Sequence, residues 1–351
     1  MPLVHAALRA RDSVRFGART GRISCPSSRR RNANQGHRQS TGSPAPGGST
    51  RSQYGACDHE RVFDDGRPAI TLVTGASRGV GKGVAAALGS TGAVVYVTGR
   101  SSGTPTQPGA GGTIEETAAL VTERGGRGVA VRCDHTDDDA VRALFDRIRV
   151  EHGRLDILVN NAWGGYAGWH SGRARDMLAP FWDKPFDIWD SMLTAGVRAH
   201  YTASALAVPL MDAGGLIVTV SMLVGTYPRA ADDVGYAVAK AADDRMMLMM
   251  GAQAGERGIT CVSLSPGLVR TELILATIDE SGFDLNTSES PELTGRAIIA
   301  LARDPDRLRL SGASLVVAEV ADHYGLTDVD GVRPPSLRPD FAREALRPPT
   351  L

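Results

Sequence analysis

The sequence predicts an α/β fold in which a parallel sheet is covered by helices on both faces, giving a single doubly wound domain with three αβα layers. Short apolar runs rich in β-branched residues alternate with helical segments between residues 67 and 332. Such alternation is typical of a parallel sheet, because each crossover helix packs on one face of it. The first apolar run, residues 69–74, also leads through a glycine-rich turn directly into a helical segment. This strand, turn and helix together predict a Rossmann-like arrangement.

The elements follow one another regularly. Strands are predicted over residues 69–74, 94–98, 128–133, 155–159, 216–220, 259–264 and 314–318. Helices are predicted over residues 79–88, 114–123, 137–150, most of 186–211, 236–253 and 291–302, with an irregular stretch over 163–185. Ligands of doubly wound folds bind at the carboxyl ends of the strands. We therefore expect the site around Thr74, Arg100, Asp134, Asn160, Ser221 and Ser265.

The glycine-rich turn runs from Thr74 to Gly81 and precedes the first helix. It aims the N-terminus of that helix at the carboxyl edge of the sheet, where free backbone N–H groups and the helix dipole favour an anion. The turn therefore predicts a site for the pyrophosphate of a dinucleotide. A tight loop without a ligand is the alternative, and the downstream chemistry argues against it.

Tyr236 and Lys240 lie four residues apart in a predicted helix, so their side chains share one face. A phenol with its ordinary pKa near 10 is a weak acid–base partner at neutral pH. A neighbouring ammonium favours phenolate and lowers that pKa. The spacing predicts a proton-donating tyrosine, Tyr236, made more acidic by Lys240.

These motifs, in this order, resemble the short-chain dehydrogenase/reductase family. Its single-domain branch carries a T-G-x-x-x-G-x-G turn, N-N-A, Y-x-x-x-K and P-G. Here they stand at Thr74 to Gly81, Asn160-Asn161-Ala162, Tyr236 to Lys240, and Pro266-Gly267 followed by Thr271. The resemblance covers roughly residues 68–332. Within the family, residues 160–166, 196–201 and 324–331 are similar to the dehydrogenase/reductase family member 1 group.

The resemblance implies an oxidoreductase that interconverts a carbonyl and an alcohol by hydride transfer. Tyr236 is then the general acid/base, and Lys240 also holds the nicotinamide ribose. The loop at Pro266 meets the nicotinamide carboxamide through the Val269 backbone and Thr271, and residues 273–290 form a lid. The implied cofactor contacts are Gly75, Ser77, Arg78, Gly79, Val80, Gly81, Arg100, Asp134, Asn160, Tyr236, Lys240, Pro266, Val269 and Thr271. For Asp134 and Asn160, a simple strand-end turn is the alternative.

The end of the second strand indicates which cofactor is preferred. NAD-binding forms place an acidic residue there for the ribose hydroxyls, whereas this chain has Gly99 followed by Arg100. An arginine grips a 2′-phosphate that an acid would repel, and Arg78 is a second cation on the same side. NADP(H) is therefore expected over NAD(H), which stays possible. A merely solvated Arg100 is the alternative.

Two positions depart from the family pattern. The serine that hydrogen-bonds the substrate oxygen is replaced by Met222, so we assign that role to Ser221, with Thr226 as a substitute. The asparagine that supports the proton relay is replaced by Gly196, and the resemblance implies the same glycine in the member 1 group. His200 is either a packed helix histidine or part of a different relay.

Substrate identity is not defined beyond a ketone or an aldehyde and the corresponding alcohol. An aromatic wall for a bulky substrate would be formed by Trp163, Tyr166, Trp169, Phe181 and Trp182, unless these side chains pack only their own loop.

A regulator that binds the dinucleotide without turnover is the alternative function, motivated by Met222 and Gly196. A nucleotide-sugar epimerase or dehydratase is disfavoured, because its usual glycine spacing and larger C-terminal region are missing.

Composition limits the remaining possibilities. Residues 1–66 hold eleven arginines, no lysine and five acidic residues, and they predict a disordered leader rich in Arg, Ser, Gly and Pro. Either a transit peptide or a nonfunctional extension explains it. The remaining chain has 28 basic and 34 acidic residues, and this lack of a basic excess predicts no nucleic-acid partner. Residues 333–351 are predicted to form a C-terminal tail outside the domain.

The four cysteines show no metal-ligand spacing, and no run of about 18 apolar residues occurs. We therefore expect no metal, no membrane span and a cytoplasmic protein. The family pairs two long helices between subunits, so a homodimer or homotetramer is expected.

Overall fold

The computed structural model describes residues 66–103, 111–166, 173–177, 179–223, 233–277 and 284–339. The predicted leader, apart from Gly66, lies outside the described residues, and so do the end of the predicted tail, Trp169 and Thr226.

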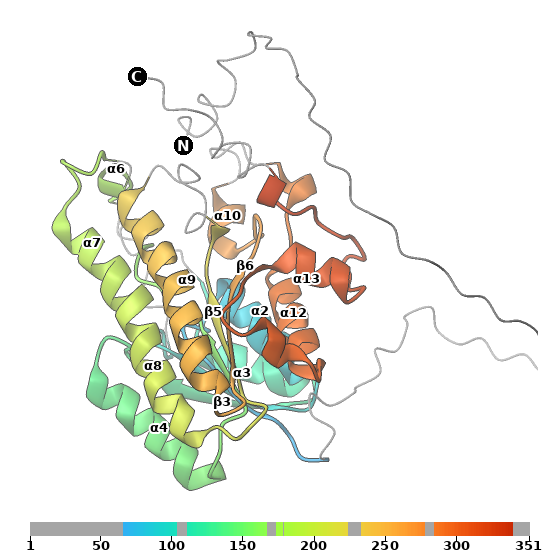
Figure 1. The fold of residues 1–351 in the computed structure, drawn as a ribbon. Coiled ribbons are helices and arrows are strands. Elements are labelled where there is room, and N and C mark those ends of the chain that lie inside the picture. The colour runs from blue at the N-terminus through green and yellow to red at the C-terminus, as the bar shows by residue number, and fades with distance from the viewer. Residues whose placement is uncertain are drawn as a thin grey trace, which may run out of the picture. The chain divides into compact units, whose positions relative to one another are not determined.

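The centre of the fold is a seven-stranded parallel sheet with the order β3-β2-β1-β4-β5-β6-β7 (Figure 1). Its strands are β1 (Ile70–Val73), β2 (Val94–Gly99), β3 (Arg127–Arg132), β4 (Ile157–Asn160), β5 (Leu216–Val220), β6 (Thr260–Ser265) and β7 (Ser314–Val316). The order reverses between β1 and β4, so a crevice for a ligand is expected at their carboxyl ends. The predicted doubly wound fold is confirmed.

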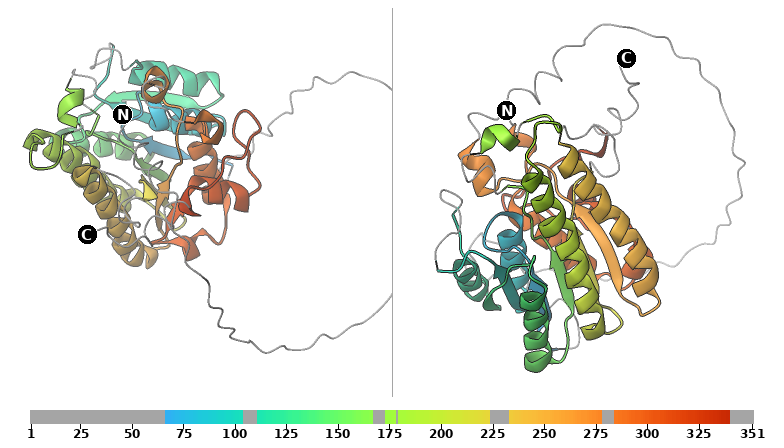
Figure 2. Two further views of the ribbon diagram at one scale, coloured as in Figure 1. Left: turned by 90° about the horizontal axis from the view of Figure 1, so that it is seen from above. Right: turned by 90° about the vertical axis from the view of Figure 1, so that its left-hand side faces the viewer.

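Helices cover both faces of this sheet (Figures 1 and 2). One face carries α2 (Gly79–Gly89), α3 (Ile114–Glu123), α12 (Pro291–Arg303) and α13 (Val317–His323). The other carries α4 (Asp138–His152), α7 (Phe186–Leu193), α8 (Ala199–Ala207) and α9 (Val234–Gly255). Successive strand residues face opposite layers. Thus Val73 packs with α2 and α12, whereas Leu72 packs with α4 and α8.

Short segments complete the described part of the chain. They are α6 (Ala174–Met177), α10 (Glu272–Ala276), η2 (Val208–Leu210), η4 (Leu285–Thr287) and η5 (Arg307–Leu310). The small helix α6 lies in the stretch predicted to be irregular. The last predicted strand was too long by two residues, because Val317 and Ala318 begin α13 and bury their side chains there.

The predicted long helix over residues 186–211 is interrupted by η1 (Thr194–Arg198), a π-helical segment between α7 and α8. Such segments widen the helix by one residue and are frequent at functional sites. Gly196 lies in the middle of η1 and is buried. The interruption therefore falls at the position where the family pattern has its relay asparagine.

Candidate active site

The glycine turn joins β1 to α2 in a conformation that favours glycine. Gly75 and Gly79 have φ angles of 64° and 56°, in the left-handed region that other residues rarely adopt. A Cβ on Gly81 would lie 2.4 Å from Nδ2 of Asn161 and 2.7 Å from the carbonyl oxygen of Gly75. The turn is therefore packed tightly against Asn161 and its own backbone, and a side chain at position 81 would not fit.

Asn161 holds this turn in place. Its Nδ2 donates to the carbonyl oxygens of Thr74 and Gly75, at 3.0 and 2.9 Å. The Thr74 hydroxyl in turn accepts from the backbone N–H groups of Asn161 and Ala162, at 2.9 and 3.0 Å. Asn161 stands in the N-N-A motif, but no pattern in the sequence indicates that its side chain holds the glycine turn.

The side chain of Asn160 lies apart from the glycine turn. It is wholly buried, and its Nδ2 donates to the hydroxyls of Ser204 and Thr219, at 2.9 and 3.3 Å. These bonds connect β4 to β5 and α8. The side chain of Asn160 thus steadies the central strands, and its predicted contact with a cofactor stays a prediction.

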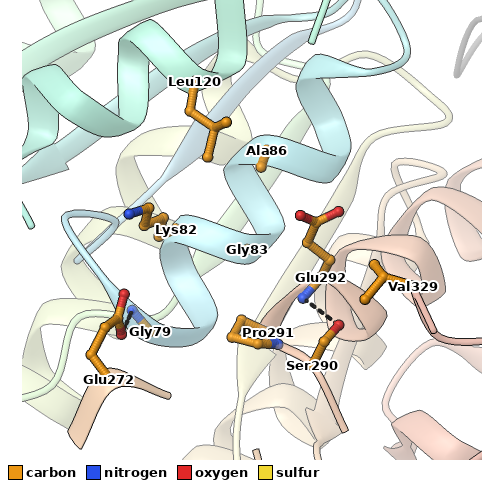
Figure 3. Close-up of a pocket in the computed structure, with 10 residues that line it drawn as sticks. All are labelled: Gly79, Lys82, Gly83, Ala86, Leu120, Glu272, Ser290, Pro291, Glu292 and Val329. Carbon is orange, nitrogen blue, oxygen red and sulfur yellow. Dashed lines mark hydrogen bonds between the residues drawn. The ribbon is translucent and has the colours of Figure 1, made fainter. Parts of the chain in front are cut away.

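The N-terminus of α2 is bound by a carboxylate. Arg78 stands at the N-cap without a side-chain capping bond, and the N–H of Gly79 donates to Oε2 of Glu272, 2.9 Å away (Figure 3). Glu272 is the first residue of α10 and lies 193 positions further along the chain. A carboxylate at this end of a helix is favoured for the same reason as a phosphate. The sequence analysis did not identify Glu272.

Charged side chains gather at the ends of β2 and β3. Burial lowers the pKa of Arg78, Glu272 opposes this effect, and the charge of Arg100 adds to it. Burial acts to raise the pKa of Asp134, but hydrogen bonds from Thr136 and the charge of Arg100 outweigh it, so that pKa is lowered. The structure thus brings Arg78, Arg100 and Asp134 within electrostatic reach of one another. Ser77 is buried beside them.

The loop predicted to meet the nicotinamide lies next to the glycine turn. Val269 pairs with Glu289 in an isolated parallel bridge, and the hydroxyl of Thr271 caps α10. The methyl carbon of Thr271 would lie 3.5 Å from a Cβ on Gly79. The loop that begins at Pro266 therefore meets the start of α2, which contains Val80, although the two are far apart in the sequence. Both segments border the same site.

Tyr236 and Lys240 occupy the first turns of α9. Asp233 caps this helix, and its Oδ1 accepts from the N–H of Tyr236 at 2.9 Å. The Lys240 ammonium is buried and donates to the carbonyl oxygen of Val220, 3.0 Å away, at the end of β5. It also lies 4.5 Å from the centre of the Trp163 ring. The cation is thus held at the carboxyl edge of the sheet.

The phenol of Tyr236 is less acidic than expected. Burial raises its pKa well above the ordinary value, and Tyr166, Asp243 and Asp233 add to this. The Lys240 ammonium forms an ion pair with Oδ2 of Asp243, at 3.2 Å. Burial thus outweighs the lowering predicted from Lys240, and Tyr236 stays protonated at neutral pH.

Trp163 explains the glycine at position 196. A Cβ on Gly196 would lie 2.4 Å from Cζ3 of Trp163, so an asparagine cannot be accommodated while the indole stays in place. The same ring makes an edge-on contact with Tyr236, with 5.4 Å between ring centres. The indole thus occupies the space beside Lys240 and Tyr236 that a relay asparagine would need.

Ser221 is directed into the protein. It is buried, and its hydroxyl donates to the carbonyl oxygen of Lys240 at 3.4 Å. Burial raises the pKa of Asp244, while hydrogen bonds with Ser263 and Ser221 act to lower it. The hydroxyl of Ser221 is therefore engaged with α9, and its predicted role as the donor to the substrate stays a prediction.

The predicted aromatic wall is divided between two places. Trp163 and Tyr166 contact each other near Tyr236, whereas Phe181 and Trp182 are 65% and 72% exposed and make an edge-on contact with one another. Phe181 and Trp182 thus lie largely in solvent. In the described ranges no cluster of His, Cys, Asp or Glu could hold a metal ion, and no helix is long and apolar enough to cross a membrane.

Comparisons with known proteins agree with this geometry. Residues 69–280 match the family model described as short chain dehydrogenase. The chain is 39% identical over 276 residues to dehydrogenase/reductase SDR family member 1 of Mus musculus, covering 75% of this chain and 83% of the relative. It is 32% identical over 224 residues to a 3beta-hydroxysteroid dehydrogenase of Mediterraneibacter gnavus, covering 62% and 71%. A solved short chain dehydrogenase from Burkholderia cenocepacia in complex with NADP superposes with a TM-score of 0.58 at 28% identity, covering 71% and 95%.

Proposed function

The chain belongs to the short-chain dehydrogenase/reductase family and is an NAD(P)-dependent oxidoreductase, and we propose that it reduces a ketone or an aldehyde to the alcohol with NADP(H). The observation that carries this proposal is the placement of Tyr236 and Lys240 at the carboxyl edge of the sheet, beside the loop that packs on the glycine turn. A proton donor and a cation there suit a carbonyl oxygen that gains negative charge.

The residues present fit a dinucleotide. The glycine turn at the N-terminus of α2 would hold the pyrophosphate, which would take the place of the Glu272 carboxylate at the N–H of Gly79. Arg78 and Arg100 would bind a 2′-phosphate, and Lys240 the nicotinamide ribose. When bound, the cofactor supplies the hydride.

The chain itself supplies the proton. The raised pKa of Tyr236 keeps the phenol protonated, which is the form needed to donate to the carbonyl oxygen during reduction. The reverse reaction needs the phenolate, so oxidation of the alcohol is expected to speed up as the pH rises toward that pKa. The residues permit both directions, and we propose reduction because cells keep NADP(H) largely reduced.

The test is a calorimetric titration of the protein with NADPH and with NADH, followed by NADPH oxidation against ketones, aldehydes and quinones. Tight NADPH binding with turnover of any carbonyl supports the proposal. Binding of neither nucleotide would refute the assignment of the glycine turn. Binding without turnover would favour the alternative, a dinucleotide-binding regulator, for which the inward hydroxyl of Ser221 is the specific observation.

Replacing Arg100 by alanine is expected to weaken NADPH binding by about tenfold to a hundredfold, because charge-assisted bonds to a phosphate contribute about 1.5–3 kcal/mol. NADH binding should change less than twofold. Arg127→Ala, at the opposite end of β3, is the matched control. Equal losses for the two nucleotides would remove the argument for NADP(H).

Replacing Glu272 by glutamine is expected to tighten NADPH binding about fivefold. The carboxylate occupies the first N–H of α2, and a charge at a helix N-terminus is worth up to about 1 kcal/mol. Glu292→Gln is the control. Glu292 lines the same surface pocket of about 170 Å³ as Glu272 (Figure 3), but it pairs with Arg124. Unchanged or weaker NADPH binding in Glu272→Gln would contradict the proposed competition between the Glu272 carboxylate and the cofactor for the N-terminus of α2.

We further propose that the protein assembles into a homodimer or homotetramer through α8 and α9. Tyr201 on α8 is 59% exposed, and Leu248 and Met249 on α9 are about half exposed. Apolar side chains along two neighbouring helices suit burial against a second copy. Sedimentation of the purified chain tests this, and a monomer at working concentration would exclude it.

A further inference from the structure

Residues 324–331, which resemble the member 1 group, have no part in the proposed reaction. They follow α13 and contain Asp328 and Asp330. Both carboxylates accept from Nη2 of Arg270, at 3.2 Å for Oδ2 of Asp328 and 3.0 Å for Oδ2 of Asp330. Arg270 belongs to residues 266–271, the loop expected to meet the nicotinamide carboxamide, which we term the nicotinamide loop. Two ion pairs thus join the C-terminal end of the domain to that loop.

The other terminal nitrogen of this guanidinium holds a third segment. Nη1 of Arg270 donates to the carbonyl oxygen and to the hydroxyl of Ser288, at 2.9 and 3.1 Å. A guanidinium with bonds on both of these nitrogens is held in one orientation, because its donors form a rigid planar fork. The Arg270 side chain is 24% exposed, so water competes for these bonds only in part. Arg270 therefore links the nicotinamide loop to residues 288–290 and 324–331.

The backbone beside Arg270 is paired as well. Its N–H donates to the carbonyl oxygen of Glu289 at 2.9 Å, and the N–H of Glu289 donates to the carbonyl oxygen of Leu268 at 2.8 Å. These bonds accompany the isolated parallel bridge between Val269 and Glu289. A bridge of one residue pair is weak by itself, since even a complete two-stranded hairpin is only marginally stable in water. The guanidinium adds a side-chain anchor to this short pairing.

The carboxylate of Asp328 is a fixed anchor. Asp328 is 2% exposed, and its oxygens also accept from the backbone N–H of Ser290, at 2.6 Å, and from the Ser290 hydroxyl. Ser290 caps α12, and the next residue, Pro291, packs against α2. A Cβ on Gly83 would lie 2.3 Å from the carbonyl carbon of Pro291 (Figure 3). Arg270 is therefore bound to a rigid part of the fold.

Glu289 is a further ionisable group next to these partners. It is 1% exposed, and a Cβ on Gly267 would lie 3.2 Å from its Oε2, so its side chain packs against the start of the nicotinamide loop. Burial raises the pKa of Glu289 to about 8, although a hydrogen bond from the backbone of Gly267 and the charge of Arg270 act to lower it. At pH 7 this carboxyl is mostly uncharged, so Asp328 and Asp330 are the main anionic partners of the guanidinium.

We propose that Arg270 is a positioning residue: its bonds to Asp328 and Asp330 hold the nicotinamide loop in the conformation that receives the nicotinamide carboxamide. The inference rests on the proposed function and deepens it, because it gives the C-terminal segment a part in binding one half of the cofactor. Arg270 itself needs no contact with the cofactor, since its guanidinium is engaged by Ser288 and the two aspartates.

The position of this anchor decides which ligands it affects. A loop that is ordered before binding adds no ordering cost when the ligand arrives. Without the Arg270 guanidinium, the ligand itself must order the loop, and only a ligand with a nicotinamide would contact it. The adenosine and pyrophosphate part is assigned to the glycine turn instead. Loss of the anchor should therefore weaken the binding of whole dinucleotides selectively.

The test compares each dinucleotide with the same molecule lacking the nicotinamide. Calorimetric titrations of the full chain at pH 7 with NADPH and 2′-phospho-ADP-ribose, and with NADH and ADP-ribose, give two affinity ratios. Arg270→Met keeps an apolar stem and removes the guanidinium. It is expected to weaken dinucleotide binding about tenfold, since ordering a loop on binding costs free energy, and to change binding of the shorter ligands less than about twofold.

Arg296→Met is the matched control. Arg296 donates to the carbonyl oxygen of Thr327 at 2.9 Å, so it holds the same C-terminal segment from α12 instead of from the nicotinamide loop. This variant should keep the wild-type affinity ratios. Equal weakening of long and short ligands in Arg270→Met would overturn the proposal, because a general loss of structure does not distinguish them. Unchanged dinucleotide binding would overturn it too.

Arg270→Lys decides the matter if Arg270→Met does not fold. A lysine keeps the charge but cannot hold Ser288 and both aspartates at once, so the affinity ratios should fall about threefold, and unchanged ratios would overturn the proposal. Failure of the wild type to bind any of the four ligands would refute the proposed function and this inference with it. The expected ratios without turnover of any carbonyl would refute the proposed reduction and leave this inference standing.

Discussion

Tyr236→Phe is expected to lower kcat by about a hundredfold to ten-thousandfold, the contribution of a positioned acid or base. The substitution removes one oxygen and keeps the ring, so the edge-on contact with Trp163 is retained. NADPH affinity should change by less than about twofold, because Lys240 and the glycine turn are untouched. Stopped-flow reduction with saturating NADPH, together with calorimetry, measures both quantities.

Tyr166→Phe is the matched control for this variant. Tyr166 is a second phenol beside the same indole, but it lies on the loop after β4 and has no proposed part in proton transfer. Its removal should leave kcat within a few-fold and make Tyr236 more acidic, since Tyr166 raises the pKa of Tyr236. Wild-type kcat in Tyr236→Phe would eliminate the acid role.

Gly196→Asn is expected to destabilise the protein by about 2–3 kcal/mol, in the upper range for overpacking a buried site. The new Cβ would lie 2.4 Å from the Trp163 ring, and either the indole or η1 must shift. Denaturant unfolding measures the loss as a lower midpoint at constant slope.

A second substitution should rescue this variant. Trp163→Ala combined with Gly196→Asn is expected to be less destabilised than the sum of the single changes by about 1–2 kcal/mol, since the collision is gone. Gly255→Asn is the control, because a Cβ there meets nothing within 4 Å. Additive losses of stability in the double variant would show that the indole of Trp163 is not the reason why a side chain at position 196 is unfavourable.

Much of the fold followed from local patterns. The inner apolar runs became β1, β2, β4 and β6, whose residues are buried throughout, because such runs leave few alternatives to a parallel strand covered on both faces. The predicted ends of strands and helices were less accurate where tertiary packing decides where an element ends. The end of β7 and the π-helical interruption at Gly196 both depend on neighbours distant in the sequence.

The site was predictable in kind and less so in detail. The glycine turn and the i, i+4 spacing of Tyr236 and Lys240 are local properties that a sequence displays directly. No spacing rule places Glu272 at the start of α2, 193 residues away, or turns Ser221 toward the carbonyl of Lys240. The phenol was expected to be acidified, but burial raises its pKa, and the charges of Tyr166, Asp243 and Asp233 add to this effect.

The sequence by itself determined the family, the doubly wound fold and the residue types available for hydride and proton transfer. These depend on periodicity and on short motifs, whose physics is contained within a few neighbouring residues. Only the tertiary structure decided which polar groups meet. It placed Asn161 against the glycine turn, the indole of Trp163 over Gly196, and His200 behind Asp243. Burial and charge are sums over atoms from many segments, so the protonation of Tyr236 becomes defined only once those segments have packed together.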